Sequence, residues 1–133
     1  MTVSLVVVSH SAKLAEGVSE LAGQMAHGKV AIAAAGGTAE GELGTSVERI
    51  LEALRQVASP DGTLILLDLG SAVMAAEMAV EQFTQLQDQR VTISPAPLVE
   101  GAIVAAVESS IGNTLEEVAD AANNAMLLPK LQS

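Results

Sequence analysis

The amino-acid sequence predicts an α/β domain with a mainly parallel central sheet of four or five strands flanked by helices. Along the 133 residues, short apolar runs alternate with segments whose apolar residues recur at helical spacing. The apolar runs, such as residues 3–8, also lack the in–out alternation of a half-exposed strand, which is typical of strands covered on both faces. Strands and helices that alternate in this way favour parallel pairing through right-handed crossovers.

The first half of the chain supplies two strands and two helices. Residues 3–8 and 30–35 are apolar runs that predict strands, and Gly28 ends the helix between them. After a glycine-rich stretch, Thr45 and Glu48 have the spacing of a capping box that opens the second helix. The apolar stripes are Leu14, Val18, Leu21 and Met25 in the first helix, and Val47, Ile50, Leu51 and Leu54 in the second.

The second half repeats this alternation. Residues 59–62 form a turn by composition, and strands are expected at 63–67 and 91–94, the latter stopped by prolines. A long helix rich in Ala and Met runs from Ser71 to about Leu86, and another covers residues 98–109. After a break at Gly112, Thr114 and Glu117 form a second capping box, which opens a last helix through about Leu127.

The composition narrows the possible functions. Six Lys plus Arg stand against sixteen Asp plus Glu, a net charge of −10 that repels nucleic-acid phosphates. With no Cys and only two His, a thiolate nucleophile, a Cys-ligated zinc and a three-His site are excluded. A metal site of mixed His and carboxylate ligands stays open on composition alone, but we expect no metal. The apolar runs fall short of the roughly 18 residues that span a bilayer, and the first residues lack the basic start of a signal peptide. We therefore expect residues 1–133 to form one cytoplasmic domain that binds no membrane.

Residues able to carry chemistry follow three of the predicted strands. His10 comes after the first strand, the segment Gly36-Gly37-Thr38 after the second, and Asp68-Leu69-Gly70-Ser71 after the third. Ligands of open α/β sheets bind outside the carboxyl ends of the strands. We therefore expect these three segments to line one crevice.

His10 lies between Ser9 and Ser11 at a strand-to-helix junction. Its small neighbours leave the ring accessible, and the free amides at the start of the next helix offer a place for an anion. Because imidazole is nucleophilic near neutral pH, His10 is a candidate covalent carrier, with a purely structural histidine as the alternative. His27, beside Gly28, is expected to cap the end of its helix.

Asp68 ends an apolar strand, where an unpaired carboxylate is costly to bury. It either caps the helix that begins near Ser71 or accepts a hydrogen bond from the His10 ring, which would fix the tautomer and raise the nucleophilicity of that ring. A hydrolytic triad of Ser71 or Ser9 with His10 and Asp68 is disfavoured, because neither serine lies in a G-x-S-x-G elbow.

The glycine-rich residues 36–44 can bring backbone amides close to a phosphate, although an ordinary flexible connection is the alternative. No lysine precedes Thr45, so the stretch is not a P-loop, and its place after the second strand does not fit a dinucleotide fingerprint. We therefore expect no bound cofactor. A phosphorylated histidine would need only a few amide donors.

Several of these motifs together resemble the DhaM family, the phosphotransferase subunits of dihydroxyacetone kinases that depend on the phosphotransferase system. They are LVVVSHS at 5–11, GGT at 36–38 with Gly41 and LGTS at 43–46, LDLGSA at 67–72 with Glu77-Met78, and PAPLVEGA at 95–102. That family's domain is similar to the enzyme IIA domains of mannose-class sugar transporters. The resemblance covers almost the whole chain and implies that fold.

The resemblance implies a phosphohistidine carrier. His10 would accept a phosphoryl group from phospho-HPr, on Nε2, and pass it to ADP bound on the DhaL subunit, where the ATP formed would phosphorylate dihydroxyacetone on DhaK. Asp68 would orient His10. The residues expected to bind the phosphoryl group or the partner are Ser9, Ser11, Gly36, Gly37, Thr38, Gly70 and Ser71. The chain would thus be a phosphotransferase subunit of a phosphoenolpyruvate-dependent dihydroxyacetone kinase.

Three further expectations concern assembly and alternatives. The alanine-rich helices favour a homodimer, because an apolar subunit interface would stabilise a core with so few large residues. One alternative function is the enzyme IIA of a mannose-class sugar transporter, which would use the same histidine and pass the phosphoryl group to a IIB domain. The other is a non-catalytic regulatory binding domain in which His10 is structural.

Overall fold

Four parallel strands form the centre of the computed structural model, which describes residues 2–86 and 89–131. The strands are β1 (Ser4–Ser9), β2 (Ile32–Gly36), β3 (Thr63–Leu67) and β4 (Val91–Ile93). Their spatial order is β2-β1-β3-β4, so the chain crosses over β1 between its second and third strands. The predicted α/β class and parallel sheet are confirmed, with four strands.

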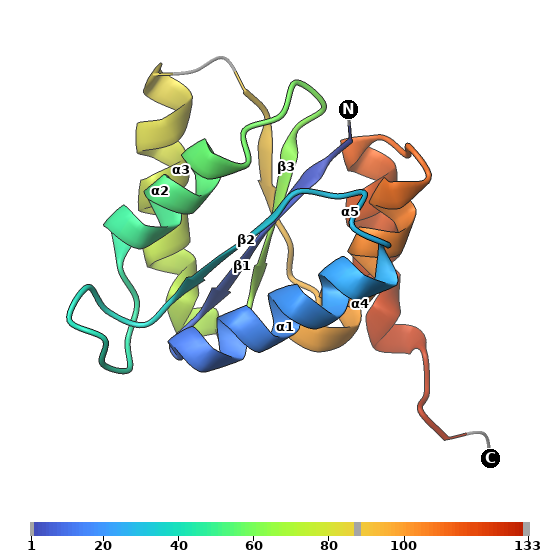
Figure 1. Ribbon diagram of the computed structural model, residues 1–133, viewed down its shortest axis with the longest axis horizontal. Coiled ribbons are helices and arrows are strands. Elements are labelled where there is room, and N and C mark those ends of the chain that lie inside the picture. The colour runs from blue at the N-terminus through green and yellow to red at the C-terminus, as the bar shows by residue number, and fades with distance from the viewer. Residues whose placement is uncertain (1, 87–88, 132–133) are drawn as a thin grey trace.

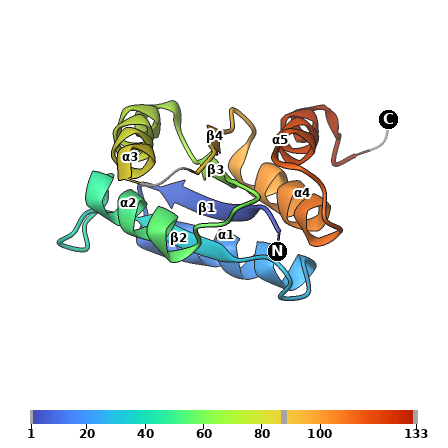
Figure 2. The ribbon, with the colours of Figure 1, turned by 90° about the horizontal axis from the view of Figure 1, so that it is seen from above.

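In the described part of the chain, five α-helices cover the two faces of this sheet (Figure 1). They are α1 (Ala12–Met25), α2 (Val47–Gln56), α3 (Val73–Leu86), α4 (Leu98–Ser110) and α5 (Leu115–Asn124), with short 3₁₀ turns η1 (Gly70–Ala72) and η2 (Ala125–Leu127). Figure 2 shows α2 and α3 together on one side of the strands and α4 and α5 on the other. α1 packs against α4 and belongs to the second group.

The alternate residues of each central strand divide between two apolar cores. Leu5 and Val7 of β1 point into the core under α1, α4 and α5, whereas Val6 and Val8 point into the core under α2 and α3. Both cores are built mostly from Val, Leu and Ala, and the only aromatic residue, Phe83, is buried in the second. Because β1 is covered on both faces, the residues between its terminal serines, 5–8, are all apolar, as the sequence indicated.

The apolar stripe predicted for α1 is wrong in part. Val18 is buried, but Leu14, Leu21 and Met25 are exposed, and the helix faces the core with alanines such as Ala15. α1 packs against both β2 and α4, and small side chains allow that close approach. Three large apolar residues are therefore left at the surface of this helix.

Helix capping differs from the prediction at α2 and agrees with it at α5. The N-cap of α2 is Ser46, whose hydroxyl accepts from the Arg49 amide, so the predicted box at Thr45 and Glu48 is wrong by one residue. Ser46 has the extended backbone that an N-cap needs. At α5 the Thr114 box is present in full, as expected. Among the described residues, no helix is both long enough and apolar enough to cross a membrane.

Candidate functional site

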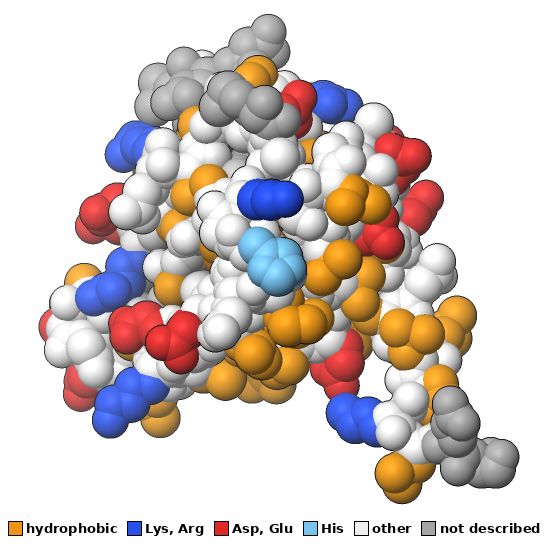
Figure 3. Space-filling view, turned by 45° about the vertical axis from the view of Figure 1, so that its right-hand side comes forward, with side chains coloured by type: hydrophobic (Ala, Val, Ile, Leu, Met, Phe, Trp, Pro, Cys, Tyr) orange, Lys and Arg blue, Asp and Glu red, His pale blue; other side chains and the backbone are white. Residues whose placement is uncertain are grey.

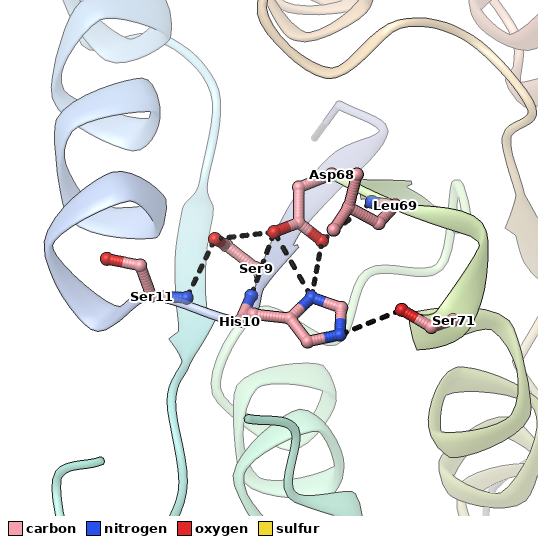
Figure 4. Close-up of polar contacts among 6 residues, drawn as sticks. All are labelled: Ser9, His10, Ser11, Asp68, Leu69 and Ser71. Carbon is pink, nitrogen blue, oxygen red and sulfur yellow. Dashed lines mark hydrogen bonds and ion pairs between the residues drawn. The ribbon is translucent and has the colours of Figure 1, made fainter. Parts of the chain in front are cut away.

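The parallel register of β1 and β3 brings His10 and Asp68 together at the carboxyl edge of the sheet. Val8 lies opposite Leu67, and the Asp68 amide donates to the Val8 carbonyl at 3.1 Å. The next residue on β1 is Ser9, after which the chain turns toward α1 and presents the His10 ring. Two residues that are 58 positions apart in the sequence thus become neighbours, as the strand-end argument predicted (Figure 4).

Asp68 binds His10 through both the ring and the backbone. The ring Nδ1 lies 3.0 Å from Oδ1 and 3.3 Å from Oδ2, and the His10 amide donates to Oδ2 at 2.9 Å. An ionised carboxylate only accepts hydrogen bonds, so this contact places a proton on Nδ1. In the neutral ring the lone pair then lies on Nε2, the nitrogen that points away from Asp68 (Figure 4).

The surroundings of Asp68 keep it ionised. Partial burial alone would raise the pKa of this carboxyl, but hydrogen bonds from the His10 amide and ring, the Ser9 hydroxyl and the Leu69 amide lower it below its usual value of 3.8. The Asp68 side chain is 11 % exposed and the His10 side chain 28 %. A negative group therefore lies behind an imidazole that a second reactant can reach.

Ser71 lies on the open side of the ring. Its hydroxyl is 3.0 Å from Nε2, and it belongs to the turn η1 that precedes α3. With the lone pair on Nε2, the Ser71 hydroxyl is the donor in this contact. Within the described part of the chain, the Gly70 and Ser71 amides donate to no protein group, so they are available to an anion near Nε2.

The two serines that flank His10 have different surroundings. Ser9 is fully buried: its hydroxyl donates to Asp68 and its oxygen accepts from the Ser11 amide. Ser11 is the N-cap of α1, and its hydroxyl accepts from the Leu14 amide. Of these two candidates, only Ser11 retains access to solvent, so direct contact of Ser9 with a phosphoryl group or a partner is disfavoured.

The glycine-rich stretch contacts the backbone around His10. The Gly37 amide donates to the Ser9 carbonyl at 3.2 Å, and the Gly44 amide donates to the His10 carbonyl at 2.9 Å. Thr38 is occupied within the loop, since its amide donates to the Glu42 carbonyl and its hydroxyl accepts from the Glu42 amide. These amides are already paired, so the loop holds the His10 segment instead of offering a free cradle.

Gly36 has a separate steric role. A Cβ atom at this position would lie 2.5 Å from the Ser11 carbonyl oxygen and 2.6 Å from the Ala12 Cα. Only glycine allows β2 to come this close to the start of α1. The glycine therefore sets the distance between the loop and the histidine segment.

Two features of the site were not predicted. One is the Gly44 contact with His10, for which the only sequence signal was a glycine within a loop of many glycines. The other is a mainly apolar hollow of about 460 Å³ that adjoins Asp68 between the ends of β3 and β4. The segment Pro95-Ala96-Pro97, expected from the sequence to stop a strand and to belong to a family motif but not to form a cavity wall, lines this hollow with Leu69 and Val73.

The remaining histidine stands apart from this cluster. His27 follows the end of α1 in the left-handed region, with a φ of 54°, and is exposed. No group of three or more His, Asp or Glu side chains that could hold a metal ion occurs in the described ranges. His10 is thus the histidine whose geometry can support chemistry.

A family model and curated relatives match this chain. The model described as "PTS system fructose IIA component" matches residues 4–119. A Pantoea ananatis protein named "PEP-dependent dihydroxyacetone kinase, phosphoryl donor subunit DhaM" is 38 % identical over 98 % of the chain, which spans only 28 % of that relative's length. A Listeria innocua protein, "PEP-dependent dihydroxyacetone kinase 2, phosphoryl donor subunit DhaM", is also 38 % identical, over 87 % of the chain and 93 % of its own length.

A solved structure is similar to this chain in both fold and sequence. The crystal structure of a protein of unknown function, EF1359, superposes with a TM-score of 0.81 at 33 % sequence identity. The match covers 93 % of this chain and 95 % of that one. The two chains thus share their fold over almost their whole length.

Proposed function

Because the chain belongs to the family of the PTS system fructose IIA component, and among its members to the DhaM phosphoryl donor subunits, we propose that His10 carries a phosphoryl group for a dihydroxyacetone kinase. The donor would be phospho-HPr and the acceptor ADP bound on DhaL, with DhaK holding dihydroxyacetone. The chain would act as the phosphotransferase subunit of that phosphoenolpyruvate-dependent kinase.

One observation carries the proposal: Asp68 binds Nδ1 at 3.0 Å, so that Nε2 points away from the carboxylate, toward the Ser71 hydroxyl (Figure 4). This arrangement directs a phosphoryl group to Nε2, because the other nitrogen holds a proton and is covered by the carboxylate. As the ring gains positive charge on attack, the Asp68 carboxylate stabilises it at close range.

The transfer consists of two displacements at phosphorus. In the first, the Nε2 lone pair forms a bond to phosphorus while the P–N bond of the donor's phosphohistidine breaks, and its electrons return to the donor ring. In the second, a β-phosphate oxygen of ADP forms a bond to the same phosphorus as the P–Nε2 bond breaks, which restores neutral His10. Transfer of this kind depends mainly on positioning and on donors to the phosphoryl oxygens.

The other candidate residues take distinct parts in this proposal. The Ser71 hydroxyl, 3.0 Å from Nε2, and the Gly70 and Ser71 amides would donate to the phosphoryl oxygens. Ser11, at the start of α1, would lie against the phosphoryl group or the partner. Gly36, Gly37 and Thr38 would hold the His10 segment and the loop beside it.

The assembly of the protein belongs to the same proposal. We propose that residues 1–133 form one enzyme IIA-like domain that acts in the cytoplasm as a homodimer. Support for a subunit contact comes from exposed apolar side chains of α1 and α4, including Leu21, Met25 and Val99. Hydrophobic side chains also gather in the lower half of the face seen in Figure 3.

The first experiment is phosphorylation followed by intact mass. The chain is incubated with phosphoenolpyruvate, enzyme I and HPr, and we expect a gain of one acid-labile phosphate. His10→Ala should lose this gain and keep its fold, whereas the control His27→Ala, which removes the exposed second histidine, should be labelled normally. Normal labelling of His10→Ala would refute the assignment.

The acceptor is tested with the phosphorylated chain. ADP-loaded DhaL should remove the phosphate and yield ATP, whereas a IIB domain should not. Transfer to IIB alone would make the chain a sugar-transporter enzyme IIA. No labelling, with HPr shown to be phosphorylated, would favour the regulatory binding domain.

A second candidate rests on the sequence of contacts Ser71–His10–Asp68, which has the connectivity of a hydrolytic triad. Ser71 lies within the 3₁₀ turn η1 and not on a nucleophile elbow, which favours the carrier. Ser71→Ala separates the two functions, because a hydrolase would lose its nucleophile while a carrier would still label on His10.

A further inference from the structure

Three buried serines of this protein share one local arrangement. In Ser9, Ser59 and Ser94, the hydroxyl oxygen accepts from the amide two residues later, at 3.0, 3.2 and 3.1 Å. Such side-chain-to-backbone bonds are a common way to end a strand or begin a turn. Because the three serines share this geometry, a substitution at Ser59 or Ser94 can serve as a control for the same substitution at Ser9.

The three serines differ in the group that receives the hydroxyl proton. The Ser59 hydroxyl donates to the Thr2 carbonyl at 2.7 Å. The Ser94 hydroxyl donates to Oδ1 of the Asn123 side chain at 3.5 Å. Ser9 donates at 3.0 Å to Oδ2 of Asp68, which is ionised. A hydrogen bond to a charged acceptor is stronger than one to a neutral carbonyl. The Ser9 hydroxyl therefore makes a stronger hydrogen bond than the hydroxyls of Ser59 and Ser94.

The position of Ser9 excludes direct contact with a reactant. The residue is completely buried, beneath the His10 segment, so neither a phosphoryl group nor a partner protein can reach its hydroxyl. The hydrogen bond from the Ser9 hydroxyl holds Oδ2 of Asp68, which also accepts from the His10 amide at 2.9 Å. The other oxygen, Oδ1, is then directed at Nδ1 and at the Leu69 amide.

We propose that Ser9 is a positioning residue for phosphoryl transfer, which acts by fixing the rotation of the Asp68 carboxylate so that Nδ1 of His10 keeps its proton and Nε2 remains the nucleophile. This inference rests on the proposed function of His10. Without the hydroxyl, Oδ2 keeps the His10 amide but loses its side-chain donor, and the carboxylate gains rotational freedom. The Ser11 amide, at the start of α1, loses its acceptor at the same time.

The test compares Ser9→Ala with Ser59→Ala, which removes the same local arrangement far along the chain from His10. Phosphoryl transfer from phospho-HPr is measured for each variant. We expect Ser9→Ala to lower kcat by about tenfold to a hundredfold, by analogy with the loss of groups that orient metal-bound histidines. KM for phospho-HPr should not change, because Ser9 does not reach the surface. Ser59→Ala should transfer at the wild-type rate.

A second readout follows the ring itself. Imidazole ¹⁵N chemical shifts report which nitrogen carries the proton, and they need no phosphoryl donor. In Ser9→Ala we expect a mixture of tautomers at His10, whereas Ser59→Ala and Ser9→Thr, which keeps the hydroxyl, should match the wild type. Thermal unfolding confirms that each variant is folded. If Ser9→Ala does not fold, Ser9→Cys replaces it, since a thiol of similar size is a weak donor.

Each outcome decides the inference. A wild-type kcat in Ser9→Ala, an effect confined to KM, or a loss equal to that of Ser59→Ala would each overturn it. Unchanged ¹⁵N shifts would do the same, as would failure of folded Ser9→Thr to restore the rate. If the wild-type chain takes no phosphate from phospho-HPr, the proposed function fails, and the ¹⁵N comparison still decides whether Ser9 orients Asp68 and His10.

Discussion

Replacing Asp68 by Asn tests how far the carboxylate controls the histidine. A carboxylate accepts at both oxygens, and here Oδ1 receives the Leu69 amide at 2.7 Å and Nδ1 of His10 at 3.0 Å, while Oδ2 receives the His10 amide at 2.9 Å. Asn offers one accepting oxygen and one NH₂ donor. It therefore cannot satisfy all of these donors in either orientation.

Both orientations of the amide are unfavourable for transfer. With NH₂ at the Oδ1 position, Nδ1 of His10 has to accept from this NH₂ group. The ring proton then moves to Nε2, which loses its nucleophilic lone pair. With NH₂ at the Oδ2 position, it opposes the His10 amide and leaves a donor unpaired. In both cases the negative charge behind the ring disappears, and the developing imidazolium loses its stabilising partner.

The expected loss of rate combines these effects. A hydrogen bond to a charged group contributes roughly 1.5–3 kcal/mol, which corresponds to about tenfold to 150-fold in rate. The wrong tautomer adds to this loss, since the corresponding Asp-to-Asn change in a Ser-His-Asp triad costs about 10⁴-fold. We expect Asp68→Asn to slow phosphoryl uptake by roughly 10²- to 10⁴-fold.

The assay is rapid quench of the reaction with phospho-HPr, followed by intact mass. Asp120→Asn is the matched control, because its carboxylate is exposed on α5. Urea unfolding is measured in parallel, and Asp68→Asn should lower the free energy of unfolding by about 1–3 kcal/mol. Uptake at the wild-type rate by a folded Asp68→Asn protein would refute the role assigned to the carboxylate.

Three further predictions concern stability and the approach of the loop. Since the pKa of Asp68 lies below its usual 3.8, ionised Asp68 stabilises the native state above that pH, and this contribution is lost as the pH falls through the lower native value. Urea unfolding should therefore show the wild type losing stability in acid more steeply than Asp68→Asn, and parallel curves would contradict this. Gly36→Ala places a Cβ 2.5 Å from the Ser11 carbonyl oxygen, so it should lower both the melting temperature and phosphoryl uptake, whereas Gly17→Ala, where nothing lies near, should not reduce either. His27→Gly should raise the free energy of unfolding by up to about 1 kcal/mol, because His27 has a φ of 54° that glycine adopts without strain; a lower urea midpoint would argue against this.

Local sequence patterns determined most of the secondary structure. The apolar run at residues 63–67 is β3 to the residue, and the spacing of Thr114 and Glu117 marks the start of α5. These features depend on interactions among neighbouring residues, so a short stretch contains the information. The candidate pair His10 and Asp68 was also predictable, because both follow buried strands and parallel strands end at one edge of the sheet.

Contacts between distant segments decided the rest. Leu14 and Leu21 are exposed because α1 packs closely against β2 and α4 through its small residues. The spacing of apolar residues along a helix does not indicate how closely that helix packs against other elements. Likewise, the pattern Ser-His-Ser does not say which serine faces inward. The register between β1 and β3 places Asp68 over Ser9, and the Gly44 amide reaches the His10 carbonyl only after the loop folds back. The sequence alone thus determined which residues lie at the edge of the sheet, whereas the orientation of their side chains was decided by tertiary packing, since hydrogen-bond partners of these groups come from strands almost sixty residues apart.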